Sequence, residues 1–366
     1  MRRAVFPLVS MLLLSSCGTA RSPVTEPPRA ASSAPAVPSD EPPAPPSAPV
    51  KRAAPRALPK PGNPDGHATV PPAARAVDTS TPDRVVGSGT AASCTSDAVV
   101  DAVAAGGVIA FDCGATPVTI MMTSTATVRN DRARVVLDGG GRVTLSGGGK
   151  RRVLYQNTCE RPATARCQDQ DEPELTLQNL VLANGDSTGS PDGGGAVFVR
   201  GGRLRVIGSR FTGNRCDLTG PDLGGAALRV LSVTAPVYVV NSTFTGGRCS
   251  NGGALSSIGV SWTILNSVFR DNQAVGRGAN PPRPGTRGGG SGGALYLDGN
   301  SFTATLSGSL IENNTANEGG GAVFFVSNDR TGTLTLAGST LRTNPSAGFE
   351  TPGYPGVFFL GKSIRK

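Results

Sequence analysis

The chain has 366 residues and a formal net charge of +9, and 50 of its residues are glycine and 30 are proline. Its only histidine, His67, lies in a proline-rich stretch. A Ser-His-Asp or Cys-His catalytic device and a histidine-ligated metal are therefore excluded from everything that follows that stretch.

Residues 1–16 are typical of a bacterial signal peptide. Arg2 and Arg3 supply the positive start, and the apolar segment after them is too short to span a membrane. Residues 14–17 read Leu-Ser-Ser-Cys, which resembles the lipobox of bacterial lipoproteins. This resemblance implies that Cys17 is lipidated and that the protein is exported and membrane-anchored, at the outer membrane or the cell surface. The alternative is an ordinary signal peptide with a chance cysteine.

Residues 17–83 are expected to form a lipid-anchored, disordered tether. Residues 18–83 contain 17 of the 30 prolines, three of the 50 glycines and no aromatic residue. A segment of this composition cannot bury enough apolar surface to fold. The folded domain is expected to span residues 84–366, where glycine becomes frequent.

A short helix is expected at residues 96–105, because Ser96 suits its start and Gly106 its end. We expect this helix to cap the first coil of a repeat stack. Short strands are expected to follow at 108–111, 118–122 and 135–137. Asp138 then precedes three glycines and is interpreted as a turn residue, with a catalytic role as the alternative.

Two short motifs alternate between residues 193 and 344. One is Gly-Gly-Ala plus an aliphatic residue, with copies that begin at Gly194, Gly252, Gly292 and Gly320. A fifth copy, from Gly224, is interpreted as carrying one extra small residue. The other motif is an apolar residue, two variable positions and Asn, at Phe211, Phe269, Ile311 and Leu341, with an early copy at Val181 to Asn184 and a copy at Phe244 in which Gly247 replaces Asn.

The Gly-Gly-Ala motifs are 28 to 40 residues apart, a period that indicates a repeat architecture. Short apolar segments rich in β-branched residues lie between them, which favours strands over helices. We therefore expect an all-β fold, a single-stranded parallel β-helix in which equivalent residues stack. Phe211, Phe244 and Phe269 are expected to stack inside it. The motif asparagines are expected to adopt left-handed backbone and to form a hydrogen-bonded ladder.

The paired motifs resemble the repeats of chlamydial polymorphic outer-membrane proteins, and more broadly the pectate-lyase-like group of parallel β-helix proteins. The resemblance covers roughly residues 175–345. It implies a right-handed solenoid. The enzymes of this fold are mostly polysaccharide lyases and hydrolases, which need a Ca²⁺-binding acid cluster with a basic residue or clustered aspartates.

Six cysteines follow Cys17, and an even number in an exported domain indicates disulfides. Chain order and repeat geometry favour the pairs Cys94–Cys113, Cys159–Cys167 and Cys216–Cys249. The last pair is the firmest expectation, because each cysteine follows its motif phenylalanine by five residues. Equivalent positions on adjacent coils are about 4.8 Å apart, within disulfide range.

The densest acidic group is Asp169, Asp171, Glu172 and Glu174. It is interpreted as a solvated acidic loop, with Ca²⁺ binding as the alternative. No other metal or cofactor is expected.

Residues 274–293 lengthen one coil and carry Arg277, Arg283 and Arg287. Long loops on a solenoid often form its recognition surface, and a basic one suits acidic polysaccharide or lipopolysaccharide phosphate. The alternative is a tolerated flexible insertion. Nucleic acid is not expected as a partner, because basic and aromatic residues are not interleaved.

The function that the sequence favours is a non-catalytic, surface-exposed binding or adhesion module, with polysaccharide as a candidate ligand. The alternative is a polysaccharide lyase or glycoside hydrolase, and a third reading is a structural envelope protein. Three acids clustered with an arginine on one face would favour the enzyme, whereas scattered acids would favour binding.

Overall fold

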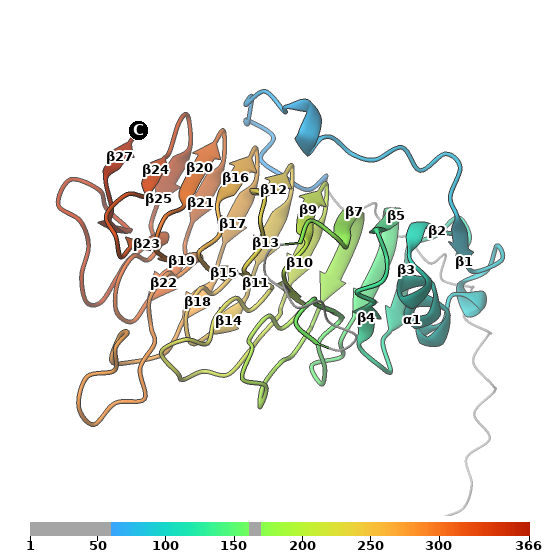
Figure 1. The fold of residues 1–366 in the computed structure, drawn as a ribbon, viewed down its shortest axis with the longest axis horizontal. Helices are drawn as coiled ribbons and strands as arrows, with labels where there is room; N and C mark the ends of the chain where they lie inside the picture. The colour runs from blue at the N-terminus through green and yellow to red at the C-terminus, as the bar shows by residue number, and fades with distance from the viewer. Residues whose placement is uncertain (1–59, 161–169) are drawn as a thin grey trace, which may run out of the picture. The chain divides into compact units, whose positions relative to one another are not determined.

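The computed structural model describes residues 60–160 and 170–366 (Figure 1). The expected signal peptide, Cys17 and the first part of the expected tether lie outside the described residues. Cys167 and Asp169 lie outside them as well.

The described residues form a right-handed parallel β-helix with a short helix at its start, as the sequence predicts (Figure 1). The labelled strands pair in parallel throughout and join into sheets of 16, eight and three strands. The 16-stranded sheet consists of β1 (Arg84–Val86), β2 (Gly107–Phe111), β3 (Val118–Met121), β5 (Arg134–Ser146), β7 (Glu174–Ala183), β9 (Arg203–Ile207), β10 (Arg210–Thr212), β12 (Val237–Val240), β13 (Thr243–Thr245), β16 (Trp262–Leu265), β17 (Val268–Arg270), β20 (Thr303–Ser307), β21 (Leu310–Glu312), β24 (Thr333–Thr335), β25 (Thr340–Arg342) and β27 (Ser363–Arg365).

The other two sheets complete each coil. The eight-stranded sheet consists of β4 (Ala126–Val128), β6 (Leu154–Asn157), β8 (Val197–Arg200), β11 (Leu228–Leu231), β15 (Leu255–Ile258), β19 (Leu295–Gly299), β23 (Val323–Ser327) and β26 (Val357–Leu360). The three-stranded sheet consists of β14 (Arg248–Cys249), β18 (Gln273–Ala274) and β22 (Thr315–Ala316).

Helix α1 (Ser96–Ala105) covers the first coil, where its buried Val99 and Val103 join the main core. Its N-cap is Thr95, whose Oγ1 accepts a hydrogen bond from Ala98 N at 3.2 Å. The helix ends at Gly106, whose φ of 74° suits glycine. Within the described part of the chain, no helix is long and apolar enough to cross a membrane.

The aromatic stack forms as expected inside the solenoid. The ring centroids of Phe211 and Phe244 are 4.6 Å apart, and those of Phe244 and Phe269 are 4.8 Å apart. Ile311 and Leu341 continue the same column in register. Each stacked pair adds roughly 0.5–1.5 kcal/mol to the free energy gained from burial.

The early copy of the asparagine motif is displaced by one residue from its predicted position. Leu182, and not Val181, pairs with Phe211. Gly185 therefore takes the place of the motif asparagine, and its N–H donates to Asn214 Oδ1 at 2.7 Å. Asn184 instead adopts left-handed backbone, with a φ of 49°.

The later motif asparagines form the expected ladder. Asn272 Nδ2 donates to Asn314 Oδ1 at 2.9 Å, and Asn314 Nδ2 donates to Asn344 Oδ1 at 2.9 Å. The predicted backbone is wrong for these asparagines. The left-handed residue is the preceding one, for example Asp271 with a φ of 57° and Asn313 with a φ of 56°. The side chain of the motif asparagine forms hydrogen bonds along the solenoid axis, and the residue before it bends the backbone.

Five serines, all buried except the half-buried Ser339, form a second ladder that the sequence did not lead us to predict. Each serine lies two residues before the stacked apolar residue of its coil. The backbone N–H of one serine donates to Oγ of the serine on the next coil at 3.1 to 3.2 Å. The series is Ser209, Ser242, Ser267, Ser309 and Ser339.

The Gly-Gly-Ala motif makes a tight corner before each strand of the eight-stranded sheet. Its first glycine has a φ between 53° and 71° at Gly194, Gly225, Gly252, Gly292 and Gly320. A Cβ there would lie 2.2 to 2.6 Å from the carbonyl oxygen three residues later. The motif expected from Gly224 therefore begins at Gly225, with Ala226 in place of the second glycine. The predicted extra residue does not exist.

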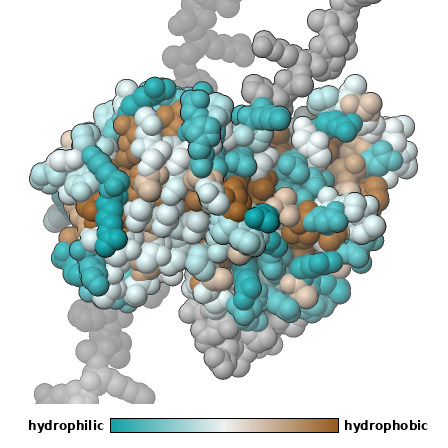
Figure 2. All heavy atoms as spheres, turned by 90° about the horizontal axis from the view of Figure 1, so that it is seen from above, coloured by the Kyte–Doolittle hydropathy of each residue, from teal (hydrophilic) through white to brown (hydrophobic). Residues whose placement is uncertain are grey.

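Residues 62–79, here named the strap, lie against the solenoid although the sequence assigns them to the tether. They run along one corner of the coils (Figure 1). The short helix η1 (Pro72–Ala74) buries Ala74 against Ile207, Val240 and Leu265. Figure 2 looks onto this side and shows apolar surface between hydrophilic side chains. The packed part of the chain therefore begins before residue 84, because the corner offers the strap both hydrogen-bond partners and an apolar seat.

Candidate functional site

Four loops of the solenoid gather at one corner of the coil, between the asparagine ladder and the Gly-Gly-Ala corner. We name this corner the loop face. In Figure 1 its loops project along the lower edge of the stack. It consists of residues 186–193, 217–223, 276–290 and 345–356.

Hydrogen bonds join three neighbouring loops of the loop face into one layer. Gly189 N donates to Asp217 Oδ2 at 2.9 Å, which links the first loop to the second. Asn280 Nδ2 donates to Asp222 Oδ1 at 3.0 Å, which links the second to the third. The layer is therefore formed before any ligand arrives, which lowers the entropic cost of binding.

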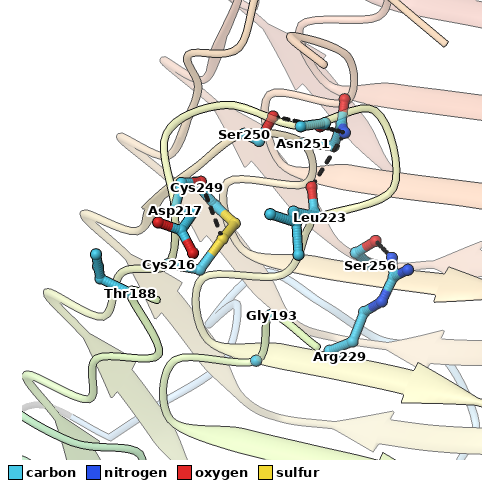
Figure 3. Close-up of a disulfide and its surroundings, with 12 residues drawn as sticks. Thr188, Gly193, Cys216, Asp217, Leu223, Arg229, Cys249, Ser250, Asn251 and Ser256 are labelled. Atoms are coloured by element: carbon cyan, nitrogen blue, oxygen red, sulfur yellow. Dashed lines mark hydrogen bonds between the residues drawn. A yellow bond between two sulfur atoms is a disulfide. The ribbon is translucent and has the colours of Figure 1, made fainter. Parts of the chain in front are cut away.

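The disulfide between Cys216 and Cys249 lies at the base of the second loop (Figure 3). The two Cα atoms are 4.8 Å apart, and the pair is the one that the sequence predicts most firmly. Ala226 packs against both cysteines. The disulfide therefore occupies the one place where an alanine replaces the second motif glycine.

Of the other two expected disulfides, the structure describes one completely. Cys94 and Cys113 are bonded, with their Cα atoms 5.6 Å apart. Cys159 is disulfide-bonded, and Cys167, its expected partner, lies outside the described residues.

Polar side chains from the next coil support the second loop. Ser250 Oγ donates to Gly220 O at 2.7 Å, and Asn251 Nδ2 donates to Leu223 O at 3.0 Å. Arg229 lies beneath the same loop, only 4% exposed, and its Nη2 donates to Asp222 O at 2.7 Å. Figure 3 shows its guanidinium reaching Ser256, to which Nη1 donates. Burial lowers the pKa of Arg229 below its ordinary value.

The third loop folds as a hairpin. Arg277 and Gly288 form an antiparallel bridge, as do Ala279 and Gly289. Glu318 anchors the hairpin, since its Oε1 and Oε2 accept hydrogen bonds from Arg283 at 2.7 and 2.8 Å. Burial raises the pKa of Glu318, but the hydrogen bonds from Arg283 and Gly278 outweigh it and the pKa lies below its ordinary value.

The three arginines predicted for the binding loop therefore have two roles. Arg283 holds the hairpin closed, whereas Arg277 and Arg287 are exposed. Neither of these two side chains forms an ion pair or donates a hydrogen bond to any residue that the structure describes. Arg248, exposed on β14 beside the disulfide, is equally unpaired within residues 60–160 and 170–366. Sequence reasoning did not select Arg248, because only the three-dimensional stack brings it to this corner.

The acidic group proposed for Ca²⁺ is not drawn together. Arg203 Nη2 lies 2.9 Å from Asp171 Oδ2, and Arg205 pairs with Glu174. Asp169 lies outside the described residues, and Glu172 is exposed. Among the residues that the structure describes, no three His, Cys, Asp or Glu side chains lie close enough to hold a metal ion.

Asp138 serves as an anchor for the turn and the strap. Its carboxylate accepts hydrogen bonds from Thr79 Oγ1 at 2.7 Å, Gln178 Nε2 at 2.8 Å, Gly140 N at 2.9 Å and Asn179 Nδ2 at 3.0 Å. Burial raises the pKa of Asp138, but these four bonds outweigh it, so that the pKa lies below its ordinary value. The geometry supports the turn interpretation over a catalytic one.

The described residues fold as a parallel β-helix whose loop face carries four loops. No protein family, no curated protein and no solved structure matches this chain.

Proposed function

We propose that the protein is a non-catalytic binding module whose loop face takes an anionic polymer such as an acidic polysaccharide. The observation that carries the proposal is the preformed loop layer, which presents Arg277 and Arg287, with Arg248 exposed on β14 beside the disulfide at its base. None of the three forms an ion pair with a carboxylate that the structure describes. Guanidinium groups bind carboxylate, sulfate and phosphate groups through paired hydrogen bonds, which suits repeating anionic units.

The proposal extends to the setting of the module. The lipobox that ends at Cys17 would hold it at the outer membrane or the cell surface, where such polymers occur. The alternating motifs support kinship with the polymorphic outer-membrane protein repeats and with pectate-lyase-like β-helices. A surface location and a rigid scaffold with loops on one corner are what an adhesion module requires.

The test is the affinity of the full-length protein, purified in detergent, for an acidic polysaccharide such as alginate. We expect the Arg277→Gln/Arg287→Gln variant to lose roughly tenfold or more in affinity, since each charge-assisted hydrogen bond contributes about 1.5–3 kcal/mol. The matched control is Arg142→Gln/Arg365→Gln, which removes two exposed arginines that lie in neither the loop face nor a neighbouring loop. Binding should also weaken with salt. Equal losses in both double variants would contradict a specific loop face.

The enzyme alternative has one pocket to be tested. A cavity of about 250 Å³ is lined by Asp131, Tyr155 and Glu160, among other residues. Burial and a hydrogen bond to Glu160 raise the pKa of Tyr155 to about 12. Size-exclusion chromatography of the polymer decides between the two functions. Polymer that shortens with the wild type but not with Glu160→Gln would establish a hydrolase or lyase and overturn the binding proposal.

A further inference from the structure

A notch interrupts another corner of the solenoid, where the chain passes from the eight-stranded to the 16-stranded sheet. The turns at this corner differ in length. Residues 232–236 and 328–332 make turns of five residues, whereas 259–261 and 300–302 make turns of three. The two long turns project as walls on either side of the two short ones. The cavity between them measures about 610 Å³.

The notch has the dimensions of a ligand site. Its walls belong to coils that are three steps apart, from β11 through β15 and β19 to β23. At about 4.8 Å per step the walls are roughly 14 Å apart. The volume lies within the range of about 300–1,000 Å³ that is typical of small-molecule pockets. A short chain of a few rings would fit, whereas a longer segment that extends along the solenoid axis would meet the walls.

Glycine keeps the floor of the notch low. A Cβ on Gly299 would lie 2.5 Å from Gly259 N, so the two short turns are in close contact. Gly259 has a φ of 65°, and a Cβ there would meet nothing within 4 Å. The space above Gly259 is therefore open, and a side chain at this position would project into it.

The chemistry of the lining is neutral and polar with two aliphatic side chains. Val233 and Ile258 supply the aliphatic part. The side chains of Ser232, Asn300 and Ser301 have no hydrogen-bond partner among the residues that the structure describes. Among the residues that the structure describes, no Lys, Arg, Asp or Glu side chain lines the cavity, whose lining is Ser232, Val233, Thr234, Ile258, Gly259, Gly299, Asn300, Ser301 and Asn328.

Carboxylates lie behind the walls and hold the wall side chains in place. Thr234 Oγ1 donates to Asp171 Oδ1 at 2.7 Å. Asn328 Nδ2 donates to Asp298 Oδ1 at 3.2 Å, which leaves the Oδ1 atom of Asn328 as an acceptor for a ligand. The wall groups are thus positioned before a ligand binds.

We infer that this notch is a second binding site, for a neutral saccharide of a few rings. Free amides and hydroxyls both donate and accept, as sugar hydroxyl groups require, and the aliphatic side chains can contact the C–H faces of the rings. With no fixed charge in the lining, a phosphate, sulfate or ammonium group would lose its hydration without compensation. The notch shares no residue with the loop face, so the inference does not depend on the proposed function.

The test is saturation-transfer NMR on the full-length protein in detergent, with neutral disaccharides of glucose, galactose and N-acetylglucosamine as probes. We expect at least one probe to receive saturation, with an affinity that changes less than about twofold between about 50 mM and about 500 mM salt. Gly259→Asn should lower that affinity at least tenfold, because asparagine tolerates the left-handed backbone and fills the notch. Gly141→Asn is the matched control, since Gly141 has a φ of 72° and equally open space. Asn300→Ala, which removes an exposed side chain without a partner, should lower the affinity several-fold with no change in folding.

Three results would overturn the inference. One is that no probe receives saturation, and another is that binding survives in both Gly259→Asn and Asn300→Ala. The third is that a neutral extended peptide displaces the saccharide with equal affinity, which would assign the notch to a peptide. Loss of alginate binding in Arg277→Gln/Arg287→Gln, with disaccharide binding intact, would support the notch as a binding site that is independent of the loop face.

Discussion

Asp138 Oδ2 accepts a hydrogen bond from Thr79 Oγ1 at 2.7 Å, and this bond fastens one end of the strap to the solenoid. Toward its other end the strap is fastened at Asn266, whose Nδ2 donates to Ala68 O at 2.9 Å and whose Oδ1 accepts from Ala68 N at 2.8 Å. Asn63 Nδ2 also donates to Gly308 O at 2.9 Å, just after β20, so the strap spans coils from β5 to β20 through a few side-chain contacts. These contacts can be removed singly.

Asn266→Gly should loosen the strap. The variant keeps the left-handed backbone, since φ is 50°, but loses two hydrogen bonds that contribute about 0.5–1.5 kcal/mol each. Asn241→Gly is the matched control, because Asn241 has a φ of 48° and its side chain makes no hydrogen bond to a described residue. We expect urea unfolding to show a lower free energy of unfolding, by about 1–3 kcal/mol, in Asn266→Gly alone. Equal effects in the two variants would show that the strap contributes nothing through this residue.

The stability of the solenoid should depend on pH through Asp138. Its pKa is lowered in the folded state, because the hydrogen bonds outweigh burial. Its contribution is therefore complete above the unfolded pKa of about 3.9 and is lost as the pH falls through the folded pKa. We expect the difference in unfolding free energy between wild type and Asp138→Asn to shrink below about pH 4. Other acids affect both proteins alike, so a difference that stays constant with pH would contradict the assignment.

Phe244→Ala should be strongly destabilising. Phe244 is fully buried between Phe211 and Phe269, and phenylalanine-to-alanine changes in cores cost about 3–5 kcal/mol. Phe244→Leu should cost less, because Ile311 shows that an aliphatic residue fits the column. Thermal or urea unfolding measures both. If Phe244→Ala and Phe244→Leu lower the free energy of unfolding equally, an aliphatic side chain does not restore any of the stability that the ring provides.

The disulfide between Cys216 and Cys249 should stabilise the folded protein by about 3–4 kcal/mol, given the 33 residues that separate the cysteines. The double variant Cys216→Ser/Cys249→Ser should lose that amount and should bind alginate more weakly, because the base of the loop layer is no longer fixed. Cys94→Ser/Cys113→Ser is the control, since that bond lies beside α1 and should leave alginate binding unchanged. Reaction of Cys216 and Cys249 with a thiol probe in the unreduced protein would show that the bond is absent.

Gly253→Ala tests the second glycine of the corner motif. A Cβ there would lie 2.3 Å from Gln273 N and 2.3 Å from Gly293 O, both of which belong to backbone. We expect this change to destabilise the protein by more than about 2 kcal/mol, or to prevent folding. Ala226→Gly, which restores the motif glycine beside the disulfide, should cost less than about 1.5 kcal/mol. A tolerated Gly253→Ala would mean that the corner can widen.

Features that repeat along the chain were predictable from the sequence. Stacked copies must occupy equivalent positions on successive coils, so the spacing in one copy can be checked against the spacing in the others. The Phe211, Phe244 and Phe269 column and the Cys216–Cys249 bond follow from equal spacing to the next coil. The position of the early asparagine motif was predicted wrongly. Val181 and Leu182 are adjacent aliphatic residues, and the sequence does not indicate which of the two faces inward. Ala226 misled for a similar reason, since a single alanine can be read as an insertion or as a replacement.

Features that join distant segments were not predictable. The strap has the composition of a disordered tether. Nothing in the sequence around Ala68 or Thr79 indicates that these residues form hydrogen bonds with Asn266 and Asp138. The notch depends on the relative length of four turns, which becomes visible only when the coils are aligned. Arg283 holds the hairpin and Arg287 stays exposed because Arg283 alone pairs with Glu318. Glu318 lies 35 residues beyond Arg283 in the chain, so the sequence does not reveal this difference.

The position of the strap also determines where mechanical load would enter the solenoid. A pull on the preceding chain reaches the stack at Gly62 and Asn63, which donate hydrogen bonds to Thr243 Oγ1 and Gly308 O. The force is then shared along a corner by bonds to several coils, which must break together in shear. β1 and α1 carry no tension until the strap has detached, so the first coil is protected from being peeled away strand by strand.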